Sequence, residues 1–265
     1  MVRCPLGNRH DGPDTLLVTS DATSDAASDA NEIEKLRELI TPARFVLWDF
    51  DGPICRLFAG RRAEQVAAGL VEWLERQGLH GLLTDTERET PDPQTVLRAV
   101  GRRHPDGDLV TALEERLTQE ELRAARSALP TAYADPLIRT WTAVGARQAV
   151  ITDASPRVVR SYLETRGLLG CFGSRLYGRT EDLHHPEPDP HRLSRALGAM
   201  GAEPSAALMI GGAARDITAA RRAGVPFLGH ARNEAGWRVL RAAGAGPVVC
   251  SLQPLLRALR AGPLR

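Results

Sequence analysis

Lysine is almost absent, cysteine is scarce and long apolar runs are missing, and each scarcity excludes a class of protein or chemistry. Lys35 is the only lysine among 34 basic residues, so chemistry that needs an amine has a single candidate near the N-terminus. The four cysteines show no paired spacing, which argues against a zinc site or a disulfide framework and fits a reducing cytoplasm. No apolar run reaches the roughly 18 residues needed to span a membrane, and the N-terminus lacks the apolar segment of a secretory signal.

An excess of either charge is also missing. The 34 basic and 33 acidic residues give a formal net charge of +1. This balance offers no electrostatic footprint for nucleic acid or for an anionic membrane, so we expect neither as a partner. With 265 residues, 43% of them apolar, the chain can bury the core of one large α/β domain, or of a core domain and a smaller one.

The pattern along the chain predicts a tail, a divided core and a helical insertion. Residues 20–31 are small, polar and acidic, and we expect residues 1–31 to form a disordered tail, with the alternative that the Ser-Asp-Ala repeats cap helices. Residues 32–58 and 146–265 carry strand signals and form the predicted core. Residues 59–145 have helical periodicity with no strand-like run, which predicts a small helical domain inserted after the first strand.

Two features of the insertion are open to interpretation. Thr118 and Glu121 have the spacing of a capping box, which predicts that a helix begins there. Arg56, Arg61 and Arg62 cluster where the insertion begins. This cluster either meets an anionic substrate or forms a solvated helix face.

Strand and helix signals alternate after the insertion. Counting the strand before it, the predicted strands cover residues 45–48, 149–152, 172–177, 206–210, 225–228 and 247–250. The predicted helices cover residues 190–201, 215–223, 233–244 and 252–260. This alternation predicts an α/β fold, a doubly wound parallel (Rossmann-like) sheet with an inserted α-helical cap domain. Ligands of such sheets bind beyond the carboxyl ends of the strands.

Polar residues stand at three of these strand ends. Asp49 and Asp51 follow an apolar strand directly, Thr152 and Asp153 follow the second, and Asp216 lies just beyond a later one. An Asp-x-Asp pair on an extended strand end would point both carboxylates to the same side. One acid could then attack a substrate or bind a cation while the other transfers a proton.

In these motifs the chain resembles the haloacid dehalogenase-like superfamily. The sequence Leu-Trp-Asp-Phe-Asp-Gly at 47–52 is similar to the first motif of the family, and Val-Ile-Thr at 150–152 is similar to the second. Glu-Pro-Asp-Pro at 187–190 resembles the third, and residues 209–225 resemble the fourth. The helical insertion stands where the family places its C1-type cap.

The resemblance implies phosphoryl transfer with Mg²⁺ on a small phosphorylated metabolite. Asp49 would attack phosphorus and form an aspartyl-phosphate, and Asp51 would protonate the leaving oxygen and later activate water. Gly52, Thr152 and Asp153 would line the phosphate site. The metal would lie among Asp49, Asp51 and the acids of the fourth motif.

The chain departs from the family pattern at three charged positions. Glu187 stands where the third motif has lysine, although a shift of two residues would place His185 there. Gly212 replaces the first acid of the fourth motif, so that only Asp216 remains, and Asp153 replaces asparagine. The local formal charge is therefore about two units more negative than the pattern, which would repel a phosphate dianion.

Three functions stay open at the level of sequence. The first is an atypical or weak phosphatase with a rearranged metal set of Asp49, Asp51, Asp216 and Glu187. The second is a catalytically degenerate protein that binds or regulates, and the third is metal-assisted chemistry on a diphosphate ester. Neither the substrate nor the oligomeric state can be inferred from the sequence.

Overall fold

A six-stranded, wholly parallel sheet organises the chain in the order β5-β4-β1-β6-β7-β8. The computed structural model describes residues 33–105, 107–179 and 191–261. In sheet order the strands are β5 (Leu176–Tyr177), β4 (Arg147–Ile151), β1 (Phe45–Trp48), β6 (Ala207–Gly211), β7 (Phe227–His230) and β8 (Val248–Val249). The predicted disordered tail at 1–31 lies outside the described residues.

The central strand β1 shows why this sheet forms. Its residues Val46, Leu47 and Trp48 are fully buried, as a strand covered on both faces requires. Val46 and Trp48 belong to one apolar cluster of the structure and Leu47 to another, so the side chains alternate between the two faces. The doubly wound α/β fold predicted from the sequence is confirmed.

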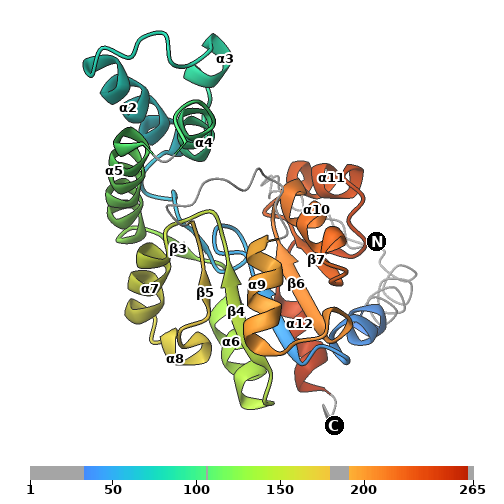
Figure 1. The fold of residues 1–265 in the computed structure, drawn as a ribbon. Coiled ribbons are helices and arrows are strands. Elements are labelled where there is room, and N and C mark those ends of the chain that lie inside the picture. The colour runs from blue at the N-terminus through green and yellow to red at the C-terminus, as the bar shows by residue number, and fades with distance from the viewer. Residues whose placement is uncertain (1–32, 106, 180–190, 262–265) are drawn as a thin grey trace, which may run out of the picture.

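Helices cover both faces of the sheet (Figure 1). One face packs against α6, α7 and α12, and the other against α9 and α10. The helices of this core are α6 (Ala134–Ala143), α7 (Pro156–Thr165), α8 (Leu169–Phe172), α9 (His191–Met200), α10 (Ala214–Arg222), α11 (Glu234–Ala242) and α12 (Gln253–Arg260). Residues 33–40 are also helical, and a short 3₁₀ turn covers Pro204–Ala206.

A second group of helices stands apart from the sheet and has its own apolar cluster (Figure 1). It consists of α2 (Ala63–Arg76), α3 (Asp85–Arg88), α4 (Pro93–Arg103) and α5 (Asp108–Ala125). The chain enters and leaves this group through a two-stranded antiparallel pair, β2 (Cys55–Arg56) and β3 (Leu129–Pro130). We call the four helices the cap.

The structure differs from the prediction at the end of the insertion. β3 lies in a segment predicted to hold no strand, because two residues that pair with a distant segment leave no periodic pattern. Helix α6 falls within residues 59–145, which were predicted to form the insertion, but it packs against the sheet. Its Trp141 meets Trp48 edge-to-face at 5.6 Å between ring centroids, and the buried Gln148 side chain donates to the Ile138 carbonyl.

The cysteines also differ from the prediction. Cys250 is disulfide-bonded, whereas Cys55 and Cys171 are free thiols. The expectation of unpaired cysteines is therefore wrong for Cys250, because sequence spacing does not report which cysteines approach each other in a fold. In the described part of the chain, every helix is too short or too polar to cross a bilayer.

Candidate active site

Three neighbouring strands bring most of the predicted polar residues to one edge of the sheet. Strand β1 lies between β4 and β6, so residues just beyond their carboxyl ends become neighbours. A narrow pocket at this edge is lined by the side chains of Asp49, Thr152, Asp153, Arg192, Arg215 and Asp216, with Leu193 and Met209 among the apolar walls. The predicted residues Glu187 and His185 lie outside the described residues.

Asp49 is the most confined acid of the pocket. Its side chain lies directly after β1, and its Oδ1 accepts a hydrogen bond of 2.7 Å from the Phe50 N–H. Burial raises the pKa of Asp49 well above its usual range, and the negative charge of Asp216 raises it further. The guanidinium of Arg215 opposes this rise. The carboxylate is therefore held in a position where a cation would stabilise its charged form.

Asp51 faces a different space from Asp49. Strand β1 ends at Trp48, so the alternation of side chains along a strand no longer applies at Asp51, which lines a larger cavity towards the cap. Its Oδ1 accepts a hydrogen bond of 3.1 Å from the Leu57 N–H. Burial raises the pKa of Asp51, partly offset by that hydrogen bond and by the charge of Arg232. A raised pKa suits a carboxyl group that donates a proton.

Gly52 makes the tight turn between these acids and β2. Its φ of +130° is a conformation that residues with a side chain rarely adopt. Its N–H donates to the Cys55 carbonyl at 2.7 Å, and its own carbonyl accepts from the Thr131 hydroxyl. Because the N–H is already bonded, the geometry gives Gly52 a role in the turn, and the phosphate contact predicted for it stays a prediction.

Thr152 has a hydroxyl that is positioned to donate. Its Oγ1 accepts a hydrogen bond of 3.2 Å from the Ala154 N–H, and its residue is 6% exposed. A hydroxyl that accepts one hydrogen bond keeps its proton for another partner. A phosphate oxygen in the pocket could be that partner.

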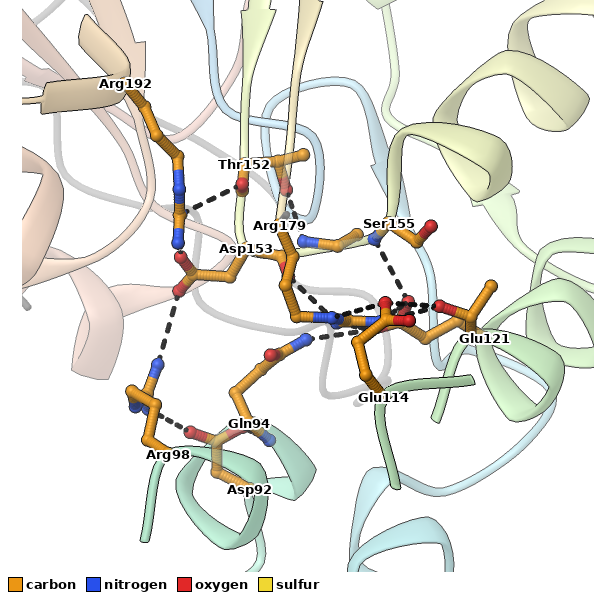
Figure 2. A network of polar contacts seen from close by, with 12 residues as sticks. Asp92, Gln94, Arg98, Glu114, Glu121, Thr152, Asp153, Ser155, Arg179 and Arg192 are labelled. Atoms are coloured by element: carbon orange, nitrogen blue, oxygen red, sulfur yellow. Dashed lines mark hydrogen bonds and ion pairs between the residues drawn. The ribbon is translucent and has the colours of Figure 1, made fainter. Parts of the chain in front are cut away.

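Asp153 is enclosed by arginines. Its carboxylate pairs with Arg192 and with Arg98 of the cap, at 3.6 Å from Nη1 (Figure 2). It also pairs with Arg215 at 2.9 Å from Nε. Burial alone would raise the pKa of Asp153, but the charges of Arg215, Arg192 and Arg98 hold it well below its usual range. Asp153 therefore orients guanidiniums around the pocket, and its charge is offset by them.

Asp216 closes the loop after β6. Its Oδ2 accepts hydrogen bonds from the N–H groups of Gly212 at 3.0 Å and Ala213 at 2.9 Å, at the beginning of α10. Burial raises the pKa of Asp216 to about 6, although Arg215 and these hydrogen bonds act against the rise. One oxygen of the carboxylate is thus used by the backbone, and the other is available to a ligand.

Gly212 leaves space where the family pattern has an acid. A Cβ placed there would lie 3.5 Å from the His230 carbonyl oxygen and 3.9 Å from the Asp51 carbonyl oxygen, which are ordinary contacts. At Gly211 a Cβ would come within 2.7 Å of Asp216 and 2.8 Å of Phe227. The backbone therefore demands glycine at 211 and permits a side chain at 212.

The residues that sequence reasoning missed are the arginines. Arg192 is the second residue of α9 and Arg215 the second of α10, so each helix start carries a cation to the strand ends. Arg215 is adjacent in sequence to Asp216, which was the one available signal. Together these arginines offset the negative charge that the sequence predicted for the pocket.

The pocket fits a magnesium ion in donor type. Asp49 and Asp216 supply carboxylate oxygens, and Mg²⁺ in proteins often uses one or two carboxylates together with water and substrate oxygens. The repulsion between these two acids is the kind of charge imbalance that a divalent cation relieves. Over residues 33–105, 107–179 and 191–261, no three His, Cys, Asp or Glu side chains gather as a fuller metal cluster would require.

A buried ionic network joins the cap to this edge of the sheet (Figure 2). Arg179, just beyond β5, donates to Glu121 Oε1 at 2.8 Å, to Glu114 Oε1 at 3.1 Å and to the Asp153 carbonyl at 3.0 Å. Glu121 in turn accepts from the Ser155 N–H at 3.2 Å. The network ties helix α5 to the segment that carries Asp153.

The same network corrects one prediction. Thr118 and Glu121 do not begin a helix, because both lie in the interior of α5. Both are fully buried, and both bind Arg179, Thr118 through its Oγ1 at 2.9 Å. Their spacing of three residues places them on one helix face, where they serve as acceptors for a guanidinium instead of as a cap.

Comparison with known proteins points in one direction. The family model described as haloacid dehalogenase-like hydrolase matches residues 14–224. Pyrophosphatase PpaX of Bacillus velezensis is 37% identical over 98 residues, which are 37% of this chain and 44% of that protein. A phosphoglycolate phosphatase of Rhodospirillum rubrum is 35% identical over 105 residues, 40% of this chain and 42% of that protein. The matched segment thus spans less than half the length of these relatives.

Solved structures share the fold. A HAD family hydrolase from Deinococcus radiodurans, with bound phosphate and sodium, superposes with a TM-score of 0.54 at 23% identity, covering 84% of this chain and 98% of that one. A haloacid dehalogenase-like family protein from Streptococcus pneumoniae gives a TM-score of 0.57 at 13% identity, covering 84% and 100%. At these identities the likeness concerns the fold alone.

Proposed function

The chain belongs to the haloacid dehalogenase-like hydrolases, and on that premise we propose that it is a phosphatase that transfers the phosphoryl group of a small phosphorylated metabolite to water. The two relatives are named a pyrophosphatase and a phosphoglycolate phosphatase, and both names specify small phosphorylated substrates. This supports a small metabolite as the substrate.

Asp49 is the proposed nucleophile. It attacks phosphorus, the bond to the leaving oxygen breaks, and an aspartyl-phosphate forms on its side chain. Its hydrogen bond from the Phe50 N–H fixes one carboxylate oxygen. The other carboxylate oxygen is then oriented for attack, because the reacting atoms must be held close together and aligned.

Asp51 is the proposed general acid and base. Burial keeps more of its carboxyl group protonated near neutral pH than an exposed aspartate would be. It gives that proton to the leaving oxygen and then takes one from the water that hydrolyses the aspartyl-phosphate, which returns it to its starting state.

Thr152 and the arginines bind the phosphate in this proposal. The Thr152 hydroxyl donates to a phosphate oxygen, and Arg215 and Arg192 supply the positive charge that a lysine supplies in the family pattern. Asp49 and Asp216, with the Asp51 carbonyl, would hold Mg²⁺, which when bound neutralises charge on the nucleophile and the phosphate.

The single observation that carries this proposal is the confinement of Asp49, 6% exposed, in one pocket with Thr152 and Arg215. The test is release of phosphate from a panel of small phosphate esters with Mg²⁺. Asp49→Asn should lower the rate at least 1,000-fold, on the order of the losses seen when a nucleophile is removed. Asp108→Asn, at an exposed aspartate of the cap, should leave it unchanged. Equal background rates for wild type and Asp49→Asn would end the proposal.

A degenerate binding protein is the second candidate, favoured by Gly212. The acid of the family pattern is missing there, and Asp216 has one oxygen occupied by the Gly212 and Ala213 N–H groups. Because a Cβ fits at 212, Gly212→Asp combined with Glu187→Lys should fold. If these losses silence the site, the double variant will gain phosphatase activity over an inactive wild type. An inactive double variant contradicts this account.

A further inference from the structure

Two cavities are separate from the pocket that holds Asp49, and Asp51 lines the first of them. The first, of about 360 Å³, is lined by Asp51, Arg56, Phe58, Arg62, Glu64 and Arg232 among others. The second, of about 290 Å³, is lined by Thr131, His230 and Ser251 and again by Arg56 and Arg232. The two cavities therefore meet at Arg56 and Arg232, at the junction of the cap and the sheet.

Arg56 and Arg232 differ from the other arginines near the acids. Arg98, Arg192 and Arg215 are ion-paired with Asp153, and Arg62 pairs with Glu64 at 3.4 Å. Within the part of the chain that the structure describes, neither Arg56 nor Arg232 has a hydrogen bond or an ion pair from its side chain. Both are exposed at the rim of the cavities. Their donors are free to bind a ligand.

The position of Asp51 decides which part of a substrate would meet them. A general acid must lie within hydrogen-bond reach of the leaving oxygen, roughly 2.6–3.2 Å. The rest of the leaving group then occupies the cavity that Asp51 lines, against Arg56 and Arg232. The guanidinium group matches carboxylate and phosphate oxygens with two parallel hydrogen bonds.

We propose that Arg56 and Arg232 form an anion subsite for the leaving group, so that the preferred substrate carries a second anionic group beside the phosphate that is transferred. This rests on the proposed phosphatase function and narrows its substrate class to small compounds with two anionic groups, either diphosphates or phosphorylated carboxylic acids. Glu64 does not oppose the subsite strongly, because its carboxylate is paired with Arg62.

The positive charge of Arg232 affects the pKa of two neighbouring groups, Asp51 and His230. It lowers the pKa of Asp51 against the effect of burial, and it adds to burial in lowering the pKa of His230. Asp51 and Arg232 both line the first cavity, so the carboxyl group and the guanidinium can contact the same bound molecule.

The test compares substrates that differ in the leaving group. Pyrophosphate leaves phosphate, 2-phosphoglycolate leaves a carboxylate-bearing alcohol, and glycerol 3-phosphate leaves an uncharged alcohol of similar size. Wild type should prefer at least one of the first two over glycerol 3-phosphate, and whichever is preferred identifies the anion. Arg56→Gln and Arg232→Gln should each lower that preference in kcat/KM at least 10-fold, mainly through a higher KM. Arg238→Gln, at an exposed arginine on α11 that pairs with Glu234, is the matched control and should keep the preference.

Calorimetric titration with pyrophosphate and 2-phosphoglycolate separates this inference from the proposed function. If wild type hydrolyses nothing but binds one of these anions at least 10-fold more tightly than Arg56→Gln and Arg232→Gln, the subsite stands and the phosphatase proposal falls. If wild type hydrolyses glycerol 3-phosphate best, or if both variants bind both anions as wild type does, the subsite is refuted while hydrolysis by Asp49 stands.

Discussion

At the scale of single residues, the pocket replaces one expected cation with several unexpected ones. The family pattern has a lysine in its third motif, where this chain is predicted to have Glu187 or His185. Arg215 and Arg192 stand at helix starts and reach the same strand ends, where Asp153 fixes them. A guanidinium is always charged and binds oxyanions with two donors, so a phosphate bound as proposed would meet a different donor geometry from that of a lysine.

The two adjacent glycines after β6 give the sharpest prediction at this scale. Gly211→Ala forces a Cβ to within 2.7 Å of Asp216 and should destabilise the fold by about 1–3 kcal/mol, as overpacking does. Gly212→Ala is the matched control, because its Cβ meets nothing closer than 3.5 Å, and it should change stability by less than about 0.5 kcal/mol. Urea denaturation of both variants measures the difference. Equal stabilities would show that the loop relaxes freely.

His230 predicts how stability depends on pH. Burial lowers the pKa of His230 to about 4, and its Nδ1 has no hydrogen-bond partner among the described residues. In the unfolded chain a histidine titrates near 6.5, so between pH 6.5 and 4 the unfolded state binds a proton that the folded state does not. The free energy of unfolding should therefore fall as the pH drops through this window, by up to about 3 kcal/mol.

The measurement is urea denaturation of wild type and His230→Gln at several pH values. The stability difference between them should change in favour of the variant below pH 6.5 and stay constant above it. His80→Gln controls for the loss of an exposed histidine. A difference that does not vary with pH would mean that His230 becomes protonated in the folded state.

At the scale of helices and strands, the sequence predicts those elements that show a local pattern of apolar residues. Strands β1, β4 and β6 are buried on both faces and appear as apolar runs, which is why β1 was predicted with its observed bounds and the ends of β4 and β6 within two residues. The segment predicted as a strand at 172–177 divides into the end of α8 and the two-residue β5. Elements this short owe their form to their neighbours, which a pattern does not contain.

In the candidate site too, residues beside a recognisable strand were predictable, and residues with distant partners were not. The acids and Thr152 were predictable, because each directly follows a recognisable strand. The role of Arg179 was not, since its partners Glu121 and Glu114 lie about 60 residues away on a helix of the cap. Long-range ion pairs of this kind leave no trace in spacing or periodicity, because they depend on how elements pack.

The Arg179 network carries a prediction about α5. Arg179 is 3% exposed and Glu121 fully buried, so Arg179→Met leaves a buried carboxylate without its cation. We expect a loss of about 3–5 kcal/mol in the free energy of unfolding, measured by urea denaturation. Arg238→Met, which breaks the exposed pair with Glu234, should cost less than about 1 kcal/mol.

A double-mutant cycle completes this test. Arg179→Met combined with Glu121→Met should be less destabilising than the sum of the two single variants, because neither charge then remains buried alone. If the losses simply add, the two side chains do not stabilise each other and the network has no role in holding α5.

At the scale of the whole molecule, the cap and the sheet share α5. Leu113 and Leu117 of α5 belong to the apolar cluster of the cap, whereas Ala124 at its end belongs to a cluster that packs on the sheet. Arg98 of α4 adds an ion pair to Asp153. The cap therefore has its own core but is joined to the other core by a helix and by buried charges.

Because α5 and the buried ion pairs connect the cap to the sheet, we expect the two to unfold in one cooperative transition. Differential scanning calorimetry of wild type should give a single peak whose calorimetric and van't Hoff enthalpies agree. In Arg179→Met, hydrogen exchange of the amides in α2 and α4 should become faster than that in β1, because the cap can then open by itself. Two peaks in wild type would show that the cap and the sheet unfold independently.

Arg179 binds both Glu121 of the cap helix α5 and the carbonyl of Asp153, the residue after Thr152. Helix α5 is therefore connected through one side chain to the end of β4. If Thr152 binds the phosphate as proposed, a cap substitution that displaces α5 will also displace the segment that carries Thr152 and Asp153. Under the proposed function, directed evolution of the cap towards a new substrate should therefore change the turnover number together with the selectivity.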